Sequence, residues 1–140
     1  QALLTDVRAP EVTHREFFKA ALSTKAIVAI TPDFSSIDFS SRAKVLAAAQ
    51  AFEDTGVSAY NGAGYLIQDA TYLTLAGKIV SVEARHASYI RNLVSYGSFA
   101  DNTILDTNGM DKQKTIAQVL TIANTYLKTK VSASAYNYIP

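Results

Sequence analysis

The spacing of the apolar residues is the feature that most limits how this chain can fold. Apolar side chains recur three and four residues apart over three long segments, about residues 1–29, 41–63 and 69–97. Such spacing gathers side chains on one face of an α-helix. A sheet would need short, turn-bounded runs in which apolar and polar residues alternate, and the sequence contains none. We therefore predict an all-α fold.

The boundaries of these helices are marked by capping and turn residues. A serine-rich stretch ends near residue 41 and supplies an N-cap for the second helix, and Asp69 is placed to cap the third. Pro10 lies inside the first predicted helix, so that helix should restart or bend there. A shorter pattern over residues 112–127 predicts one more helix, followed by a tail.

Composition excludes several classes of protein. The chain has 140 residues, 49% of them hydrophobic, which suits one domain with a real core. Its net charge of +1, with both signs interspersed, provides no basic stripe for nucleic acid. No apolar run approaches the roughly 20 residues of a transmembrane helix. Because there is no cysteine, any metal must bind through histidine and carboxylate.

Both histidines of the chain stand three residues after a glutamate, in Glu11-Val-Thr-His14 and Glu83-Ala-Arg-His86. The sequence contains only four glutamates, so two such coincidences would arise by chance about once in a thousand sequences of this composition. Residues three apart on a helix are neighbours on one face, where a carboxylate and an imidazole can bind the same ion. Each motif therefore makes half of a metal site.

Helical bundles with two metal ions combine two Glu-x-x-His helices with two helices that carry a single glutamate. Glu53 lies on the predicted helix between the two motifs, within a stripe that is otherwise apolar. We therefore predict five metal ligands: Glu11, His14, Glu53, Glu83 and His86.

Each of these residues also has an ordinary structural interpretation. A single inward histidine is more often a hydrogen-bonded core residue than a ligand, and a single glutamate is usually solvated or paired. Three carboxylates and two imidazoles in one core, however, would be costly to bury without a cation. The metal site is therefore the favoured interpretation. Asp54 is expected in solvent or in a salt bridge, and Arg91 is expected to pair with an exposed acid or to extend its charge into solvent. Tyr60 and Tyr89 have two interpretations, redox activity near a metal and core packing with a hydrogen-bonded hydroxyl, of which core packing is favoured.

The segments that carry the predicted ligands resemble a known family. Residues 11–22, 52–63 and 79–91 are similar to the ferritin-like domain family that includes plant desiccation-related proteins and many bacterial relatives, and residues 99–120 fit its C-terminal portion. The resemblance implies a ferritin-like four-helix bundle with a short C-terminal helix. It also implies metal-ligand roles for the five residues named above.

The resembled family begins with one more helix, which carries a fourth glutamate. We therefore expect residues 1–140 to form a single ferritin-like domain without that N-terminal helix, which was removed, is unrepresented here or comes from a partner chain. A three-helix remainder would expose an apolar groove, which predicts a homo-oligomer or association with another chain.

The resemblance implies a dinuclear metal cofactor, with iron as the first choice and manganese or zinc as alternatives, since carboxylate and imidazole suit all three. The predicted role is that of an oxidase, a ferroxidase or a peroxide-handling protein. The alternatives are a non-catalytic structural or stress-protection bundle that assembles with partner chains, and a module that sequesters metal without turnover. By family analogy the protein is expected outside the cytoplasm, periplasmic or secreted.

Overall fold

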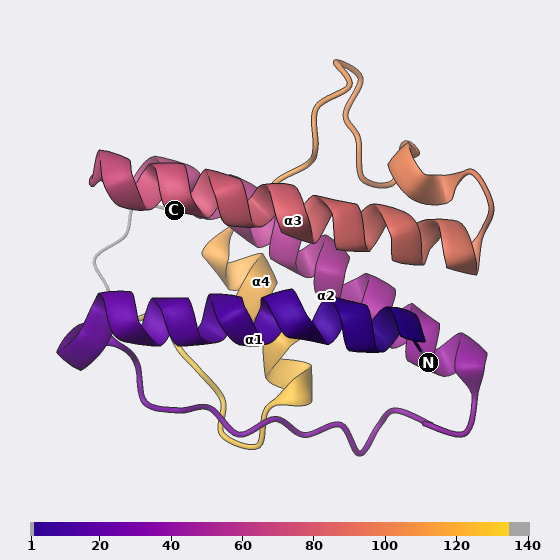
Figure 1. Cartoon of the computed structure of the whole chain (residues 1–140), viewed down its shortest axis with the longest axis horizontal. Coiled ribbons are helices and arrows are strands. Elements are labelled where there is room, and N and C mark those ends of the chain that lie inside the picture. Colours follow the sequence, from indigo (N-terminus) through magenta and orange to yellow (C-terminus); the bar gives the residue numbers. More distant parts are fainter. Residues whose placement is uncertain (1, 135–140) are drawn as a thin grey trace. The chain divides into compact units, whose positions relative to one another are not determined.

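The computed structural model describes residues 2–134, and it is helical (Figure 1). Its α-helices are α1 (Ala2–Leu22), α2 (Arg42–Ala63), α3 (Ala70–Val94) and α4 (Ile116–Ala123), with short 3-10 helices η1 (Ser23–Lys25), η2 (Gly64–Leu66), η3 (Ser98–Ala100) and η4 (Asn124–Tyr126). Across these described residues, β structure is limited to two isolated bridges. The prediction of an all-α fold is confirmed.

The chain divides into two compact units, Gln1–Ile30 and Thr31–Pro140. The first unit consists of α1, η1 and an extended segment. α1 runs without interruption through Pro10, so the predicted restart is wrong, and the alternative, a bend at this proline, stays a prediction. The helix also ends seven residues earlier than predicted, because Ser23 adopts a positive φ of 47° and Ala26 is already extended.

The second unit is built on the antiparallel pair of α2 and α3, which η2 connects (Figure 1). Both predicted caps are present. The Ser41 hydroxyl accepts the N–H of Lys44, and the Asp69 carboxylate accepts the N–H groups of Thr71 and Tyr72. These bonds satisfy donors that have no partner within the helix and so fix where each helix begins.

The core of the second unit lies between α2, α3 and the C-terminal segment. Its buried apolar residues are Leu46, Val57, Ala76, Ile79, Ala87, Ile90 and Leu127. The end of α2 packs closely against the chain near Lys114, whose N–H donates to the carbonyl of Ser58 at 2.9 Å. A Cβ atom on Gly62 would lie 1.9 Å from the Lys114 carbonyl oxygen, so this position requires glycine.

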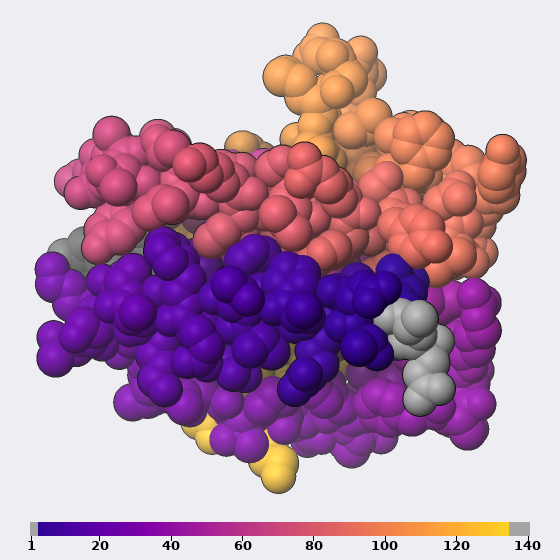
Figure 2. Space-filling model, in the orientation of Figure 1, coloured from indigo at the N-terminus to yellow at the C-terminus, as the bar shows by residue number. Residues whose placement is uncertain are grey.

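The connection between α3 and α4 reverses direction twice. Gly97, with φ of +86°, turns the chain into η3, and Gly109, with φ of +76°, forms the tip of a small hairpin closed by the bridge between Leu105 and Asp111. The hairpin stands out from the surface (Figure 2). The hairpin occupies the start of the helix predicted over residues 112–127, so α4 begins only after Thr115. A capping box between Thr115 and Gln118 provides acceptors for backbone N–H groups at this end of the helix.

The start and end of the second unit are paired with each other. Pro32 forms an antiparallel bridge with Leu127, and backbone bonds join Asp33 to Tyr126 and Lys128 to Thr31. The predicted C-terminal tail extends beyond the described residues. In the described part of the chain, no helix combines the length and apolar character needed to span a membrane.

Candidate metal site

Three of the predicted ligands meet between α2 and α3 of the second unit. Glu53 comes from the middle of α2, and Glu83 and His86 lie one turn apart on α3. The Nδ1 atom of His86 is 3.8 Å from Oε2 of Glu53 and 3.7 Å from Oε2 of Glu83. One candidate ligand atom from each of the three residues lies within 4.8 Å of the others. The i, i+3 spacing thus puts a carboxylate and an imidazole of α3 opposite a carboxylate of α2.

These polar groups are largely removed from solvent. The side chains of Glu53, Glu83 and His86 are 12%, 8% and 13% exposed. Two carboxylates this close repel each other in a medium of low dielectric constant, and burial makes both charges more costly. A cation among them would offset that cost.

The distances suit a shared metal ion. In octahedral coordination with metal–ligand distances of about 2.1 Å, two ligand atoms at adjacent corners lie about 3.0 Å apart and two at opposite corners about 4.2 Å apart. The two distances from His86, 3.7 and 3.8 Å, fall between these values. The donor set of two carboxylates and one imidazole also matches iron, manganese and zinc. The residues present therefore fit a metal ion.

The other motif lies in the first unit, on α1. Glu11 and His14 are both half-buried, whereas Thr13, Arg15 and Glu16 next to them are exposed. The pair therefore shares a face of α1 that is less exposed than its neighbours. That these two residues belong to the same centre as Glu53 stays a prediction.

The two Glu-x-x-His motifs lie in the part of the chain that matches a known family. A model of the ferritin-like domain matches residues 1–96, a stretch that contains all five predicted ligands. The chain belongs to the ferritin-like domain family. Searches of the curated proteins and of the solved structures found no match. The sequence match thus shows the family of this ferritin-like domain, and the α2–α3 pair gives the geometry of its candidate site.

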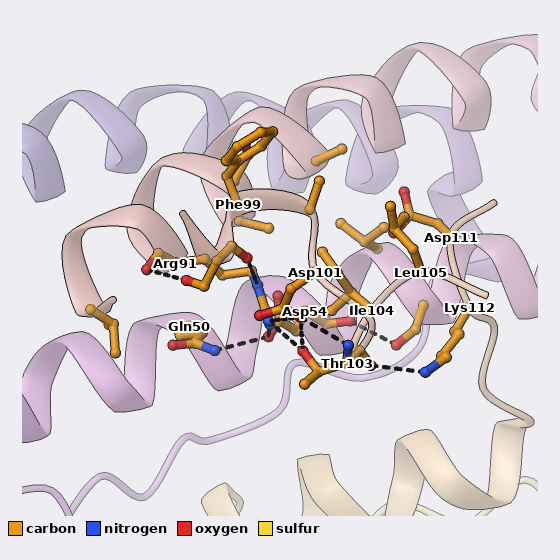
Figure 3. A pocket seen from close by; sticks show the side chains of 18 of the residues that line it. Gln50, Asp54, Arg91, Phe99, Asp101, Thr103, Ile104, Leu105, Asp111 and Lys112 are labelled. Atoms are coloured by element: carbon orange, nitrogen blue, oxygen red, sulfur yellow. Dashed lines mark hydrogen bonds and ion pairs between the residues drawn. The ribbon is translucent and has the colours of Figure 1, made fainter. Parts of the chain in front are cut away.

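A second polar group of the ferritin-like domain was not predicted. Arg91, on α3 and only 4% exposed, makes ion pairs with Asp54 of α2 at 2.6 Å and with Asp101 at 2.9 Å. Its Nε donates to the carbonyl of Ser98, and Nη2 also donates to the hydroxyl of Thr103 (Figure 3). Ion pairs were among the predictions for both Asp54 and Arg91 and are present, but the expected surface position of Arg91 is wrong. The guanidinium instead joins α2, α3 and the segment after η3.

The location of this network has a simple explanation. Asp54 follows Glu53 directly, so the two acids leave α2 about 100° apart and serve two different faces of the helix pair. Asp54 also accepts a weaker bond from Gln50 at 3.5 Å. The pairing of Arg91 with Asp101 could not be expected from helical periodicity, because Asp101 lies beyond the end of α3.

Proposed function

We propose that this ferritin-like domain is a dinuclear metal-carboxylate protein with an oxidative role, and that its ligands are Glu11, His14, Glu53, Glu83 and His86. The observation that carries the proposal is the buried group of two carboxylates and one imidazole between α2 and α3. The Glu-x-x-His pair on α1, with the same spacing as the pair on α3, supports a second half of the centre.

Each residue has a defined part in this proposal. Glu53 would be the ligand that α2 supplies, and Glu83 and His86 would be one motif pair on α3. Glu11 and His14 are the matching pair on α1. The ligand set of such a centre has a further glutamate, which we expect from the additional helix of the family or from a partner chain.

The carboxylate-rich donor set favours iron or manganese, with zinc as the alternative. Bound iron would supply one-electron redox chemistry with oxygen or peroxide. The protein residues hold the ligand atoms at fixed separations, limit the access of water, and offset the positive charge of the metal with carboxylates. The ion pairs of Arg91 with Asp54 and Asp101 help to hold α2 against α3, and so keep Glu53 opposite His86.

The first test is metal content by elemental analysis of protein purified without chelator. We expect about two iron or manganese ions per chain and their loss in the double variant Glu83→Ala/His86→Ala. Glu16→Ala is the matched control, because Glu16 is an exposed glutamate whose carboxylate pairs with Arg15. If the protein holds no metal even after reconstitution with ferrous iron, the metal proposal is wrong. The domain is then a structural or stress-protection bundle that needs no metal.

A further inference from the structure

Several aromatic side chains of the second unit are exposed where the chain leaves α3. Tyr89 is 55% exposed, Tyr96 is 95% exposed and Phe99 is 55% exposed. The prediction that Tyr89 packs in the core is wrong. Large side chains gain free energy from burial, so three exposed rings within eleven residues suggest a surface that binds something.

These rings are held on a rigid frame. The N–H of Gly97 donates to the Asn92 side chain at 2.9 Å, and the Ser98 hydroxyl donates to the carbonyl of Arg91 at 2.8 Å. Arg91 in turn donates to the carbonyl of Ser98 at 2.8 Å. η3 is therefore tied to the last turns of α3, and Phe99 is fixed although its ring is exposed. Such preorganisation lowers the entropic cost of binding.

Two hollows meet at Phe99. One is a shallow groove of about 670 Å³ on the outer face of α3, lined by Arg85, Ser88, Tyr89, Asn92, Tyr96, Gly97 and Phe99. The other is a half-open cavity of about 840 Å³ between α2, α3 and the segment that follows η3 (Figure 3). Ser88 and Phe99 line both hollows, so the groove and the cavity are adjacent.

The larger cavity is balanced in charge. Three acidic and three basic residues line it: Asp54, Asp101, Asp111, Arg91, Lys112 and Lys114. The cations are already engaged by the protein. Arg91 is bound to two carboxylates, the ammonium of Lys112 donates to the carbonyl of Asn102 at 2.7 Å, and that of Lys114 donates to the hydroxyl of Ser58 at 3.1 Å.

A charged ligand would therefore gain little in this cavity, whereas a neutral ligand rich in hydroxyl groups would find many partners. The remaining polar lining consists of amide and hydroxyl side chains, among them Gln50, Ser88, Ser95, Gln113 and Gln118. Such groups both donate and accept hydrogen bonds. Carboxylates fixed by Arg91, such as Asp54 and Asp101, are further acceptors for ligand hydroxyls.

We propose that the groove and cavity that meet at Phe99 bind a carbohydrate chain. The apolar face of a sugar ring carries C–H groups that stack on the electron-rich face of an aromatic ring. Tyr89, Tyr96 and Phe99 provide such rings, and the hydroxyl groups of the sugar are bound by the amide and hydroxyl side chains. The amide nitrogen of Asn92, whose oxygen already accepts from Gly97, is a further donor in the lining of the groove.

This site shares no residue with the proposed metal ligands. Asp54, Val57 and Ala87 line the cavity, whereas Glu53, Glu83 and His86 do not. The two proposals can therefore fail separately, and the binding experiment uses the same full chain with or without metal.

The test is binding to three insoluble polysaccharides, cellulose, chitin and a β-1,3-glucan, by co-sedimentation, and to soluble starch by affinity electrophoresis. We expect the protein to bind at least one of the four. Tyr96→Ala and Phe99→Ala should each weaken that binding about tenfold, the effect of losing one aromatic contact. Phe99→Tyr keeps a ring and should retain binding.

Tyr65→Ala is the matched control, because Tyr65 is 68% exposed and lines neither hollow. Circular dichroism of every variant checks that the fold is kept. Absence of binding to all four polysaccharides would overturn the proposal. It would also be overturned by binding that Tyr96→Ala and Phe99→Ala leave unchanged, or by an equal loss in Tyr65→Ala, which would indicate adsorption of exposed tyrosines.

Discussion

Four aspartates of this chain share one local structure. Asp33, Asp38, Asp101 and Asp106 each accept the backbone N–H of the residue two positions later, which is a serine, a threonine or an asparagine. Bonds of this kind favour the charged carboxylate. The pKa of all four carboxyl groups is accordingly lowered from the usual 3.8. The pattern Asp-x-Ser/Thr/Asn is thus a turn signal that also stabilises a charge.

Asp101 leads to a prediction about pH. Its pKa is lowered first by the hydroxyl of Thr103, then by the N–H of Thr103, with Arg91 adding to the effect. A carboxyl group with a lowered pKa in the folded state stabilises the fold above its unfolded pKa, and this contribution is lost as pH falls through the folded value. Asp101→Asn should therefore be less stable than the wild type near neutral pH, and the difference should shrink below the usual pKa of 3.8.

Urea unfolding between pH 2 and pH 7, followed by circular dichroism, measures this difference. Thr103→Val removes the main donor and should abolish much of the same pH dependence. Asn102→Ala, which leaves the bonds to Asp101 in place, is the control. A stability difference between the wild type and Asp101→Asn that stays constant over the whole range would contradict the assignment.

The sequence predicted that Glu53, Glu83 and His86 lie together, but it did not predict the network around Arg91. Glu83 and His86 could be recognised because a helix has a fixed period, and Glu53 because a charge interrupts an apolar stripe. Arg91 carries no such signal, since a long basic side chain next to an apolar stripe is normally extended into solvent. Its burial depends on Asp54 and Asp101, which approach it only in the folded unit.

The helices themselves show what local sequence determines. α2 and α3 begin where Ser41 and Asp69 were expected to cap them, because capping depends on the next three residues alone. α4 begins later than predicted because the hairpin around Gly109 uses residues 104–112 for its own pairing, and the helix ends at Ala123, directly before η4. The end of α1 was also misplaced, since apolar residues such as Ile27 and Val28 continue past it in an extended segment.

Two glycines of α2 give a matched pair of substitutions. In Gly62→Ala the new Cβ would meet the backbone carbonyl of Lys114 at 1.9 Å, so the chain must shift. We expect a loss of about 1–3 kcal/mol in the free energy of unfolding, typical of overpacking. Gly56→Ala has open space around its Cβ and should gain up to about 1 kcal/mol, because alanine favours the helix.

Urea unfolding at one pH measures both glycine variants in the same way. A gain or no change in Gly62→Ala would show that the segment around Lys114 does not pack on the end of α2 as described. A loss in Gly56→Ala of similar size would show that the cost belongs to glycine replacement in α2 in general, rather than to the contact with Lys114.

At the scale of the whole molecule, the proposed metal centre would connect the two units through Glu11 and His14 of α1. The first unit ends in an extended and largely exposed segment, in which Val28 is 86% exposed. A metal ion that binds residues of both units stabilises the state in which they are joined, by about 2.7 kcal/mol when free metal is 100 times the dissociation constant. Hydrogen exchange that requires opening of α1 should then be slowed about 100-fold.

Hydrogen exchange of the metal-free full chain, with and without Mn²⁺, tests this coupling. We expect Mn²⁺ to slow exchange of the α1 amides around Glu11 as well as those of α2 and α3 around Glu53 and His86. In Glu11→Ala/His14→Ala the slowing should remain in α2 and α3 but disappear from α1. If the wild type gains protection in α2 and α3 alone, the metal is bound by the second unit without α1. Glu11 and His14 would then have a role within α1 rather than as metal ligands. The centre would hold fewer ions than two Glu-x-x-His pairs predict.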